Sequence, residues 1–419
     1  MRALAEVSNS CDSLLSPPGP PRLGEEARWT HVVSHLDPKY GGLSAAVPAL
    51  GSAIAEASRF TVSINAFCHE REHFSPAPGE RVDVRYMPLG RFEFWRDAEA
   101  RRDFNRTVAG SAGVHIHGLW QHSTSAAAQA ARTLDKPYVV SAHGMLERWA
   151  LANKRLKKAV YAALFERRNL QRAACLHALT EAEADDYRRF GLPNPIAVIP
   201  NGVTIPSASS PERFLNQFPS LRGKRLVLFL GRIHFKKGLD GLCQAWAQVR
   251  SQWPDAHLVL AGPNSENTRS RIEALCGSLG ITRDVTFTGM VSGELKWSAL
   301  AAAECFILPS YSEGLSVSVL EAMGMGLPVI ITEQCNLPEV AANDCGWVIQ
   351  PRAEQIASAL NSFLRASSSD MAQVGRNGRS LVDRRYTWPR VGEQMSSLYE
   401  WLLGGSVPSD IELRREGSQ

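Results

Sequence analysis

Two glutamates eight positions apart, Glu313 and Glu321, are the residues whose type and spacing offer the most specific chemistry in this chain. Glu313 follows an apolar run at 305–308 that predicts a buried strand, and Glu321 lies in a stretch that predicts a helix ending before Pro328. Carboxylates on both sides of such a junction can accept hydrogen bonds from the hydroxyl groups of a sugar and of a ribose. Pairs with this spacing are common by chance, so their meaning depends on the residues around them.

A glycine and two cations follow the apolar run at 226–230, namely Gly231, Arg232 and Lys237. A glycine lets a ligand approach the backbone closely, and two cations neutralise phosphate charge, so this loop is a candidate diphosphate site. Taken alone, a solvated basic loop is the more common explanation. The glutamate pair later in the chain favours the phosphate interpretation.

Three strand ends in the first half of the chain carry further candidates. His143, His117 and Trp120 end two predicted strands, and Gly41-Gly42 lies in the loop after a third. Open α/β sheets bind ligands at the carboxyl ends of their strands. Individually these signals are weak, because a lone histidine there is more often structural and paired glycines are ordinary turn formers.

Two groups of histidines were weighed as metal sites. The segment 69–73 has the His-Glu-x-x-His pattern of zinc proteases, which needs a helix that places both histidines on one face. A strand-like run before it and two prolines after it leave little room for that helix. His115, His117 and His122 have no acidic cluster beside them. We therefore expect neither a metal site nor a cofactor.

Short apolar strand candidates alternate with helical stretches along the chain. They lie at 31–34, 61–64, 82–86, 114–117, 138–141 and 196–199 in the first half, and at 226–230, 258–260, 285–287, 306–308 and 329–331 in the second. This alternation is typical of parallel sheets covered by helices, and there is enough of it for two sheets.

Length and composition agree with two domains in a reducing compartment. A chain of 419 residues is too long for one ordinary core, and 21% charged residues with 44% apolar ones are typical of a soluble globular protein. The eight cysteines are scattered, without a Cys-x-x-Cys pair. No run of 18 apolar residues and no signal peptide is found, so we expect a cytoplasmic protein.

Changes in composition predict the domain boundaries. We expect a disordered leader over 1–28, a first domain over 29–205, a linker over 206–222, a second domain over 223–385, a helix over 386–404 and a disordered tail over 405–419.

Together these motifs resemble those of the retaining glycosyltransferases of family 4, the glycosyl transferases group 1. The resemblance rests on the Glu-x7-Glu stretch, on the loop from Gly231 to Lys237 and on the His143-Gly144 strand end, and it covers roughly 29–404. It implies the α/β fold called GT-B, with two Rossmann-like domains whose parallel sheets face an interdomain cleft. It also implies that the helix at 386–404 returns to the first domain.

The resemblance assigns a role to each candidate residue. His143 and Glu313 would face the transferred sugar, while Arg232 and Lys237 would stabilise the departing diphosphate. Glu321 would accept hydrogen bonds from the ribose. The remaining donor-binding residues would be Gly231, Gly314, Leu315, Ser316, Met290 and Val291, and the acceptor and phosphate loops would contain Gly41, Gly42, His117 and Trp120.

The implied reaction transfers a hexose from a UDP- or GDP-sugar, with retention and without a metal, to a growing lipid-linked oligosaccharide. The stretches at 143–146 and 200–203 resemble enzymes that assemble exopolysaccharide, capsule or O-antigen at the cell surface. The alternatives are another activity of the same fold, such as a sugar-nucleotide epimerase, and a non-catalytic protein that binds sugar nucleotides.

The basic stretch at 148–172 is a candidate contact with a membrane or with an anionic acceptor. Residues 148–172 carry eight basic residues against the single Glu166, around an apolar stripe that includes Leu156, Val160 and Leu164. This pattern fits a solvated helix, or a helix in peripheral contact with the anionic inner face of the plasma membrane or with a lipid-diphosphate acceptor. Because the positive charge is local, we expect no nucleic-acid partner.

Overall fold

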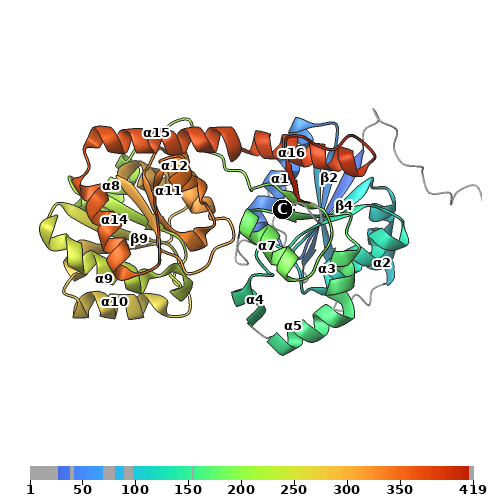
Figure 1. Cartoon of the computed structure of the whole chain (residues 1–419), viewed down its shortest axis with the longest axis horizontal. Helices are drawn as coiled ribbons and strands as arrows, with labels where there is room; N and C mark the ends of the chain where they lie inside the picture. Colours follow the sequence, from blue (N-terminus) through green and yellow to red (C-terminus); the bar gives the residue numbers. More distant parts are fainter. Residues whose placement is uncertain (1–26, 38–41, 69–80, 89–97, 153–154, 415–419) are drawn as a thin grey trace, which may run out of the picture.

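Two sheets organise the structure, and except for β14 (Glu412–Arg414) each takes its strands from one half of the chain (Figure 1). The computed structural model describes residues 27–37, 42–68, 81–88, 98–152 and 155–414. The α/β class with parallel sheets, expected from the alternating pattern, is confirmed.

The first sheet has eight strands in the order β14-β7-β6-β5-β4-β1-β2-β3. Its strands are β1 (Arg28–Val33), β2 (Thr61–Cys68), β3 (Val82–Pro88), β4 (Gly113–His117), β5 (Tyr138–Ser141), β6 (Cys175–Ala178), β7 (Ile196–Val198) and β14 (Glu412–Arg414). All pairs are parallel except β14 with β7. The helices of this half are α1 (Leu43–Ala57), α2 (Ala98–Ala109), α3 (His122–Thr133), α4 (Arg148–Ala152), α5 (Arg155–Tyr161), a π-helical turn (Ala162–Glu166), α6 (Arg167–Gln171) and α7 (Glu181–Arg189).

The second sheet has six parallel strands in the order β10-β9-β8-β11-β12-β13. They are β8 (Arg225–Leu230), β9 (Ala256–Ala261), β10 (Val285–Gly289), β11 (Cys305–Leu308), β12 (Val329–Thr332) and β13 (Gly346–Ile349). The helices are α8 (Glu212–Gln217), α9 (Leu239–Val249), α10 (Thr268–Ser278), α11 (Gly293–Ala302), α12 (Val317–Gly324), α13 (Glu339–Ala342), α14 (Ala353–Arg365) and α15 (Ser368–Arg385). Its central strands are buried apolar runs, as expected for a sheet covered on both faces.

The helix α16 (Trp388–Leu402) follows α15 and packs against α1 of the first domain (Figure 1). A Cβ atom at Gly392 would lie 2.3 Å from the carbonyl oxygen of Ala53, so glycine permits this close contact. The ring of Tyr399 stacks on that of Trp29 with 3.6 Å between the ring centroids. The last long helix is therefore part of the first domain's core.

Three expected boundaries need correction. The linker expected over 206–222 contains α8, and Phe214 and Leu221 are buried in the core of the second domain. The disordered tail expected from 405 instead contains β14, which Arg414 ties to Asp185 with a 2.8 Å ion pair. The leader expected over 1–28 overlaps the start of β1. Serine, proline and glycine are frequent in these segments, so their few anchoring residues gave no clear signal.

Candidate active site

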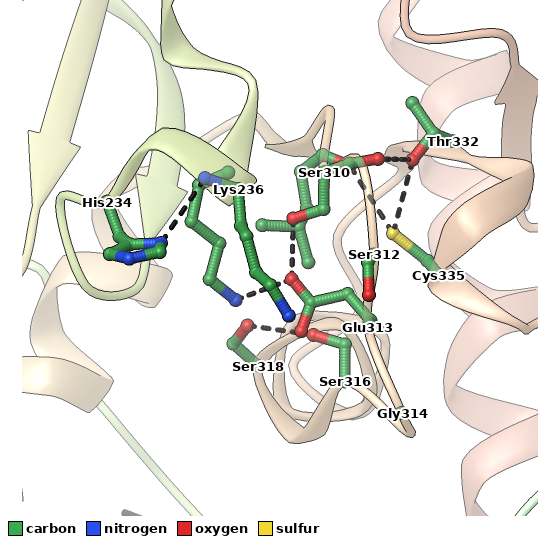
Figure 2. Close-up of polar contacts among 12 residues, drawn as sticks. His234, Lys236, Ser310, Ser312, Glu313, Gly314, Ser316, Ser318, Thr332 and Cys335 are labelled. Carbon is green, nitrogen blue, oxygen red and sulfur yellow. Dashed lines mark hydrogen bonds and ion pairs between the residues drawn. The ribbon is translucent and has the colours of Figure 1, made fainter. Parts of the chain in front are cut away.

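The loops after β8 and β11 bring Lys237 and Glu313 together. The Lys237 ammonium lies 2.5 Å from Oε1 of Glu313. The Ser310 hydroxyl donates to the same oxygen at 2.5 Å (Figure 2). The two side chains are only 18% and 13% exposed. Two residues that the sequence separates by 76 positions therefore meet at the carboxyl edge of the second sheet.

The loop that carries Glu313 is anchored from the side of β12. The Glu313 N–H donates to the carbonyl of Gln334 at 3.0 Å, and the Asn336 amide donates to the carbonyl of Glu313 at 2.6 Å. The Thr332 hydroxyl donates to the carbonyl of Ser310 at 2.6 Å (Figure 2). Because both the N–H and the carbonyl of Glu313 are hydrogen-bonded, the position of its carboxylate is preorganised.

Lys237 ends a 3-10 turn (Phe235–Lys237) and is followed by Gly238 in the left-handed conformation, with φ +65°. A Cβ atom at Gly238 would lie 2.0 Å from the carbonyl oxygen of Pro309. Glycine is therefore required both for the backbone angle and for the close contact that places Lys237 beside the Glu313 loop.

Glu321, the second carboxylate of the pair, lies on α12. Its Oε1 is 2.6 Å from the ammonium of Lys296 on α11, a residue that the sequence analysis did not single out. Met290 and Val291 follow β10 at the same edge of the sheet, and Met290 is 70% exposed while Val291 is buried. Leu315 and Ser316 precede the first turn of α12.

His143 and Gly144 form the opposite wall, contributed by the first domain. A cavity of about 200 Å³ between the domains is lined by His143, Gly144, Glu147, Ala150, Arg232, His234, Lys236, Lys237, Ser312, Glu313 and Gly314. All four residues for which a catalytic role was expected therefore line one cavity.

The backbone of His143 is held in an unusual conformation, with φ +53°. The next N–H group, on Gly144, donates to the Glu183 carboxylate at 2.7 Å, and the preceding one, on Ala142, donates to the Tyr187 hydroxyl at 2.7 Å. These buried bonds hold the strained turn and so fix the direction of the His143 ring. Burial raises the pKa of Glu183 to about 7.

Two contacts join the walls of the cavity. The Ser312 hydroxyl donates to Glu147 at 2.8 Å, and the Lys236 ammonium lies 3.2 Å from the ring centroid of Trp149. Burial raises the pKa of Glu147 and lowers that of Lys236. Sequence reasoning missed these residues, and their only signal was their closeness in sequence to His143, Lys237 and Glu313.

Among the described residues expected in the acceptor and phosphate loops, none lines this cavity. His117 is 1% exposed and lies behind His143, so it has no direct access to the cavity. The indole N–H of Trp120 donates to the carbonyl of Met145 at 3.3 Å. Gly42 precedes α1 on the surface, whereas Gly41 and the segment 69–73 lie outside the described residues.

The buried histidines form a different group from the one weighed in the sequence. Ring nitrogens of His31, His115 and His117 lie within 4.8 Å of one another, a spacing that a metal ion would accept. This group contains His31 in place of His122, which the sequence analysis considered. These nitrogens, however, hydrogen-bond to one another or to neighbouring side chains. Desolvation lowers the pKa of His31 to about 3 and lowers those of His115 and His117.

Comparison with known proteins defines the class. Residues 212–381 match the family model for glycosyl transferases group 1, and residues 41–202 match the model for the glycosyl transferase 4-like domain. Among solved structures, sucrose-phosphate synthase from Thermosynechococcus elongatus is similar with a TM-score of 0.73 and 22% identity, over 91% of this chain and 100% of that one. The Anabaena protein HepE, in complex with UDP and glucose, has a TM-score of 0.71 and 17% identity, over 90% and 100%. The fold is thus GT-B.

Two curated relatives illustrate the similarity in sequence. An α-D-kanosaminyltransferase from Streptomyces kanamyceticus is 26% identical over 56% of this chain and 62% of its own. The GDP-mannose:cellobiosyl-diphosphopolyprenol α-mannosyltransferase from Xanthomonas campestris is 23% identical over 70% and 74%. For the first three relatives the match spans 45%, 62% and 44% of their length, about half. The chain belongs to the glycosyl transferases group 1 family.

Proposed function

We propose that this protein transfers a hexose from a UDP- or GDP-sugar to a lipid-linked oligosaccharide, with retention of the anomeric configuration. The observation that carries the proposal is the single cavity that joins Arg232, Lys237 and Glu313 of the second domain to His143 of the first. This cavity combines cations that could bind a diphosphate with a carboxylate and an imidazole that could bind a sugar.

The cations act on the leaving group. When the bond from the sugar to the diphosphate breaks, negative charge grows on the phosphate oxygens, and Lys237 and Arg232 stabilise it more strongly in the transition state than in the ground state. Backbone N–H groups at the start of α12 add partial positive charge. We propose that these groups make a divalent metal unnecessary, so that EDTA leaves the rate unchanged.

The remaining polar groups orient the sugar and the ribose. Glu321 would accept hydrogen bonds from the ribose and would share its carboxylate with Lys296, which already lies 2.6 Å away. Glu313 and His143 would contact hydroxyl groups of the transferred hexose. The contacts from Glu147 to Ser312 and from Trp149 to Lys236 hold the domains together around the donor and limit its hydrolysis by water.

An exposed apolar patch supports a membrane-associated acceptor. The patch consists of Leu156, Val160, Leu164 and Phe165, which are between 51% and 83% exposed. Arg155, Lys157, Arg167 and Arg168 are exposed around it. Apolar side chains ringed by cations suit an anionic lipid surface.

The name of one relative and the lengths of the helices bear on the proposal of a membrane-associated acceptor. The Xanthomonas relative is named for a mannosyl transfer to a cellobiosyl-diphosphopolyprenol. None of the helices in the described part of the chain is long and apolar enough to cross a bilayer. We therefore propose peripheral contact at the inner face of the plasma membrane and a role in cell-surface polysaccharide synthesis.

A screen of UDP- and GDP-hexoses tests the activity. The wild-type protein is incubated with each donor, and both the melting temperature and the release of UDP or GDP are followed. One donor should stabilise the protein by mass action and also be consumed. Lys237→Ala should lower the rate at least about 100-fold, whereas Lys224→Ala, beside His257 at the other end of β8, should not change it.

The screen also separates the alternatives. A donor that stabilises the wild type but releases no nucleotide, with any acceptor tried, would identify a non-catalytic sugar-nucleotide-binding protein. A donor that is converted to another sugar nucleotide, without release of the diphosphate, would identify an epimerase. Either result would refute the transferase proposal.

A further inference from the structure

A continuous chain of hydrogen-bonded side chains runs from His177 on β6, through residues of β5, β4, α16 and β1, to His143. It begins where Nε2 of His177 lies 2.8 Å from the carbonyl of Ile199. Nδ1 of His177 lies 2.6 Å from the Ser141 hydroxyl, which lies 2.7 Å from Nε2 of His115. Nδ1 of His115 lies 2.6 Å from the Tyr399 hydroxyl, which lies 3.0 Å from Nε2 of His31. Nδ1 of His31 lies 3.0 Å from Nε2 of His117, and Nδ1 of His117 lies 3.1 Å from Nε2 of His143.

The carbonyl of Ile199 fixes the direction of the first part of this chain. A carbonyl only accepts, so Nε2 of His177 carries the proton, and Nδ1 of the neutral ring is an acceptor. The Ser141 hydroxyl must then donate to His177. Since that hydroxyl has a single proton, it accepts from Nε2–H of His115.

The direction of each hydrogen bond from His115 to His143 is fixed in the same way. Nδ1 of His115 is now an acceptor, so the Tyr399 hydroxyl donates to it and accepts from Nε2–H of His31. His117 then donates from Nε2 to Nδ1 of His31, and His143 donates from Nε2 to Nδ1 of His117. Every proton in the chain is assigned, and Nδ1 of His143 is left with a lone pair.

This arrangement of protons requires neutral imidazole rings, and burial keeps the rings neutral. His31, His115, His117 and His177 are each at most 1% exposed. Desolvation lowers the pKa of His143 to about 3 and that of His177 to about 4, and it raises that of Tyr399 so that its hydroxyl keeps its proton. A metal ion held by His31, His115 and His117 would need nitrogen lone pairs that the hydrogen bonds already use.

We propose that Tyr399, His31 and His117 are positioning residues that hold His143 as the Nε2–H tautomer, so that Nδ1 meets the ligand as a hydrogen-bond acceptor. The role of His143 toward a sugar rests on the proposed function, whereas the tautomer does not. A neutral Nδ1 acceptor binds a sugar hydroxyl that donates to it, but it supplies no proton to the departing diphosphate. That charge is left to Arg232 and Lys237.

The tautomer can be measured directly. Long-range ¹H–¹⁵N NMR of the full-length protein, with the His143 signals assigned by their loss in His143→Gln, reads which ring nitrogen carries the proton. The expected result at pH 7.5 is a protonated Nε2 and an unprotonated Nδ1 in His143. A protonated Nδ1 in the wild type would overturn the proposal, whatever the activity of the protein.

Two variants test the relay. Tyr399→Phe keeps the ring that stacks on Trp29 but removes the hydroxyl, and it should give a mixture of His143 tautomers and a roughly tenfold lower kcat/KM. Ser111→Ala, which removes another buried hydroxyl bonded to Thr30 at 2.5 Å, should leave the His143 signals unchanged.

If Tyr399→Phe does not fold, Ser141→Ala breaks the chain elsewhere and should have the same effect. Unchanged His143 signals in a folded relay variant would refute the relay, while the transfer assay separately tests the proposed function.

Discussion

Lys237 and Glu313 lie so close that any diphosphate held by Lys237 must compete with the glutamate. Their 2.5 Å contact is largely shielded from water. Two charges attract each other more strongly in such a shielded place than at an open surface. Lys296 and Glu321 form a similar pair at 2.6 Å. In both places a carboxylate keeps a cation in position, so the cleft is preorganised at some cost in affinity for the nucleotide.

Neutralising Glu313 should therefore separate binding from turnover. Glu313→Gln frees Lys237, and we expect UDP or GDP to bind roughly three- to tenfold more tightly, while kcat falls because the sugar loses its carboxylate contact. Titration calorimetry and nucleotide release measure the two effects. Glu304→Gln, which removes the partner of Arg225 on the surface, is the matched control. Weaker nucleotide binding by Glu313→Gln would contradict this account of the pair.

Glu166 predicts a dependence of stability on pH. It is 2% exposed, it accepts the N–H of Trp120 at 3.2 Å, and desolvation raises its pKa from 4.5 to about 7. Its favourable contribution is fully present below about pH 4.5 and is lost as the pH rises through 7. Glu166→Gln should match the wild type at pH 5 and be more stable at pH 8, by a free energy of unfolding of the order of 3 kcal/mol. Denaturant unfolding at both pH values measures the difference, and a difference independent of pH would contradict the assigned pKa.

At the scale of elements, the turn between β8 and α9 depends on Gly238. Gly238→Ala forces a Cβ atom against the carbonyl of Pro309 and strains a left-handed residue, so we expect a loss of stability of at least about 1 kcal/mol and weaker nucleotide binding. Gly277→Ala in α10, where nothing lies within 4 Å of the new Cβ atom, should be neutral or slightly stabilising. Thermal unfolding with and without nucleotide compares the two variants. Equal effects would show that the turn does not position Lys237.

The exposed apolar patch on α5 and the π-helical turn is predicted to bind lipid. Leu156 is 83% exposed, so Leu156→Asp should leave the fold intact and lower binding to vesicles rich in anionic lipid roughly tenfold. Val407→Asp, at another exposed position, should have no effect. Co-sedimentation with anionic and with zwitterionic vesicles gives the measurement. Equal binding by the wild type and Leu156→Asp would remove the membrane proposal.

For the whole molecule, the sequence was informative where its patterns are periodic. Apolar runs predicted eleven strands that the structure contains. The family resemblance assigned Arg232, Lys237, Glu313 and His143 to one cleft, and these residues line one cavity. The pattern of apolar runs missed β6, which contains a histidine, β13, which begins with a glycine, and β14, in which two of the three residues are charged, so none of them is a plain apolar run. Contacts between distant segments, such as those of Glu147 with Ser312 and of Tyr399 with His31, leave no local signal in a single chain.

Helix α16 returns to the first domain and contributes a residue to the hydrogen-bonded chain behind the cavity. Tyr399 comes from the last long helix and yet lies in the middle of the hydrogen-bonded chain that ends at His143. The end of the chain therefore helps to complete the first domain's side of the cleft, so a truncation before α16 would alter the site as well as the core.

The anomeric configuration of the product tests the central claim most directly. The donor found in the screen, with an α-configured anomeric carbon, is incubated with a sugar-bearing polyprenyl diphosphate, and the new linkage is assigned by ¹H NMR. The account predicts an α-linked product from the wild type. A β-linked product would contradict the retaining mechanism assigned to this cleft.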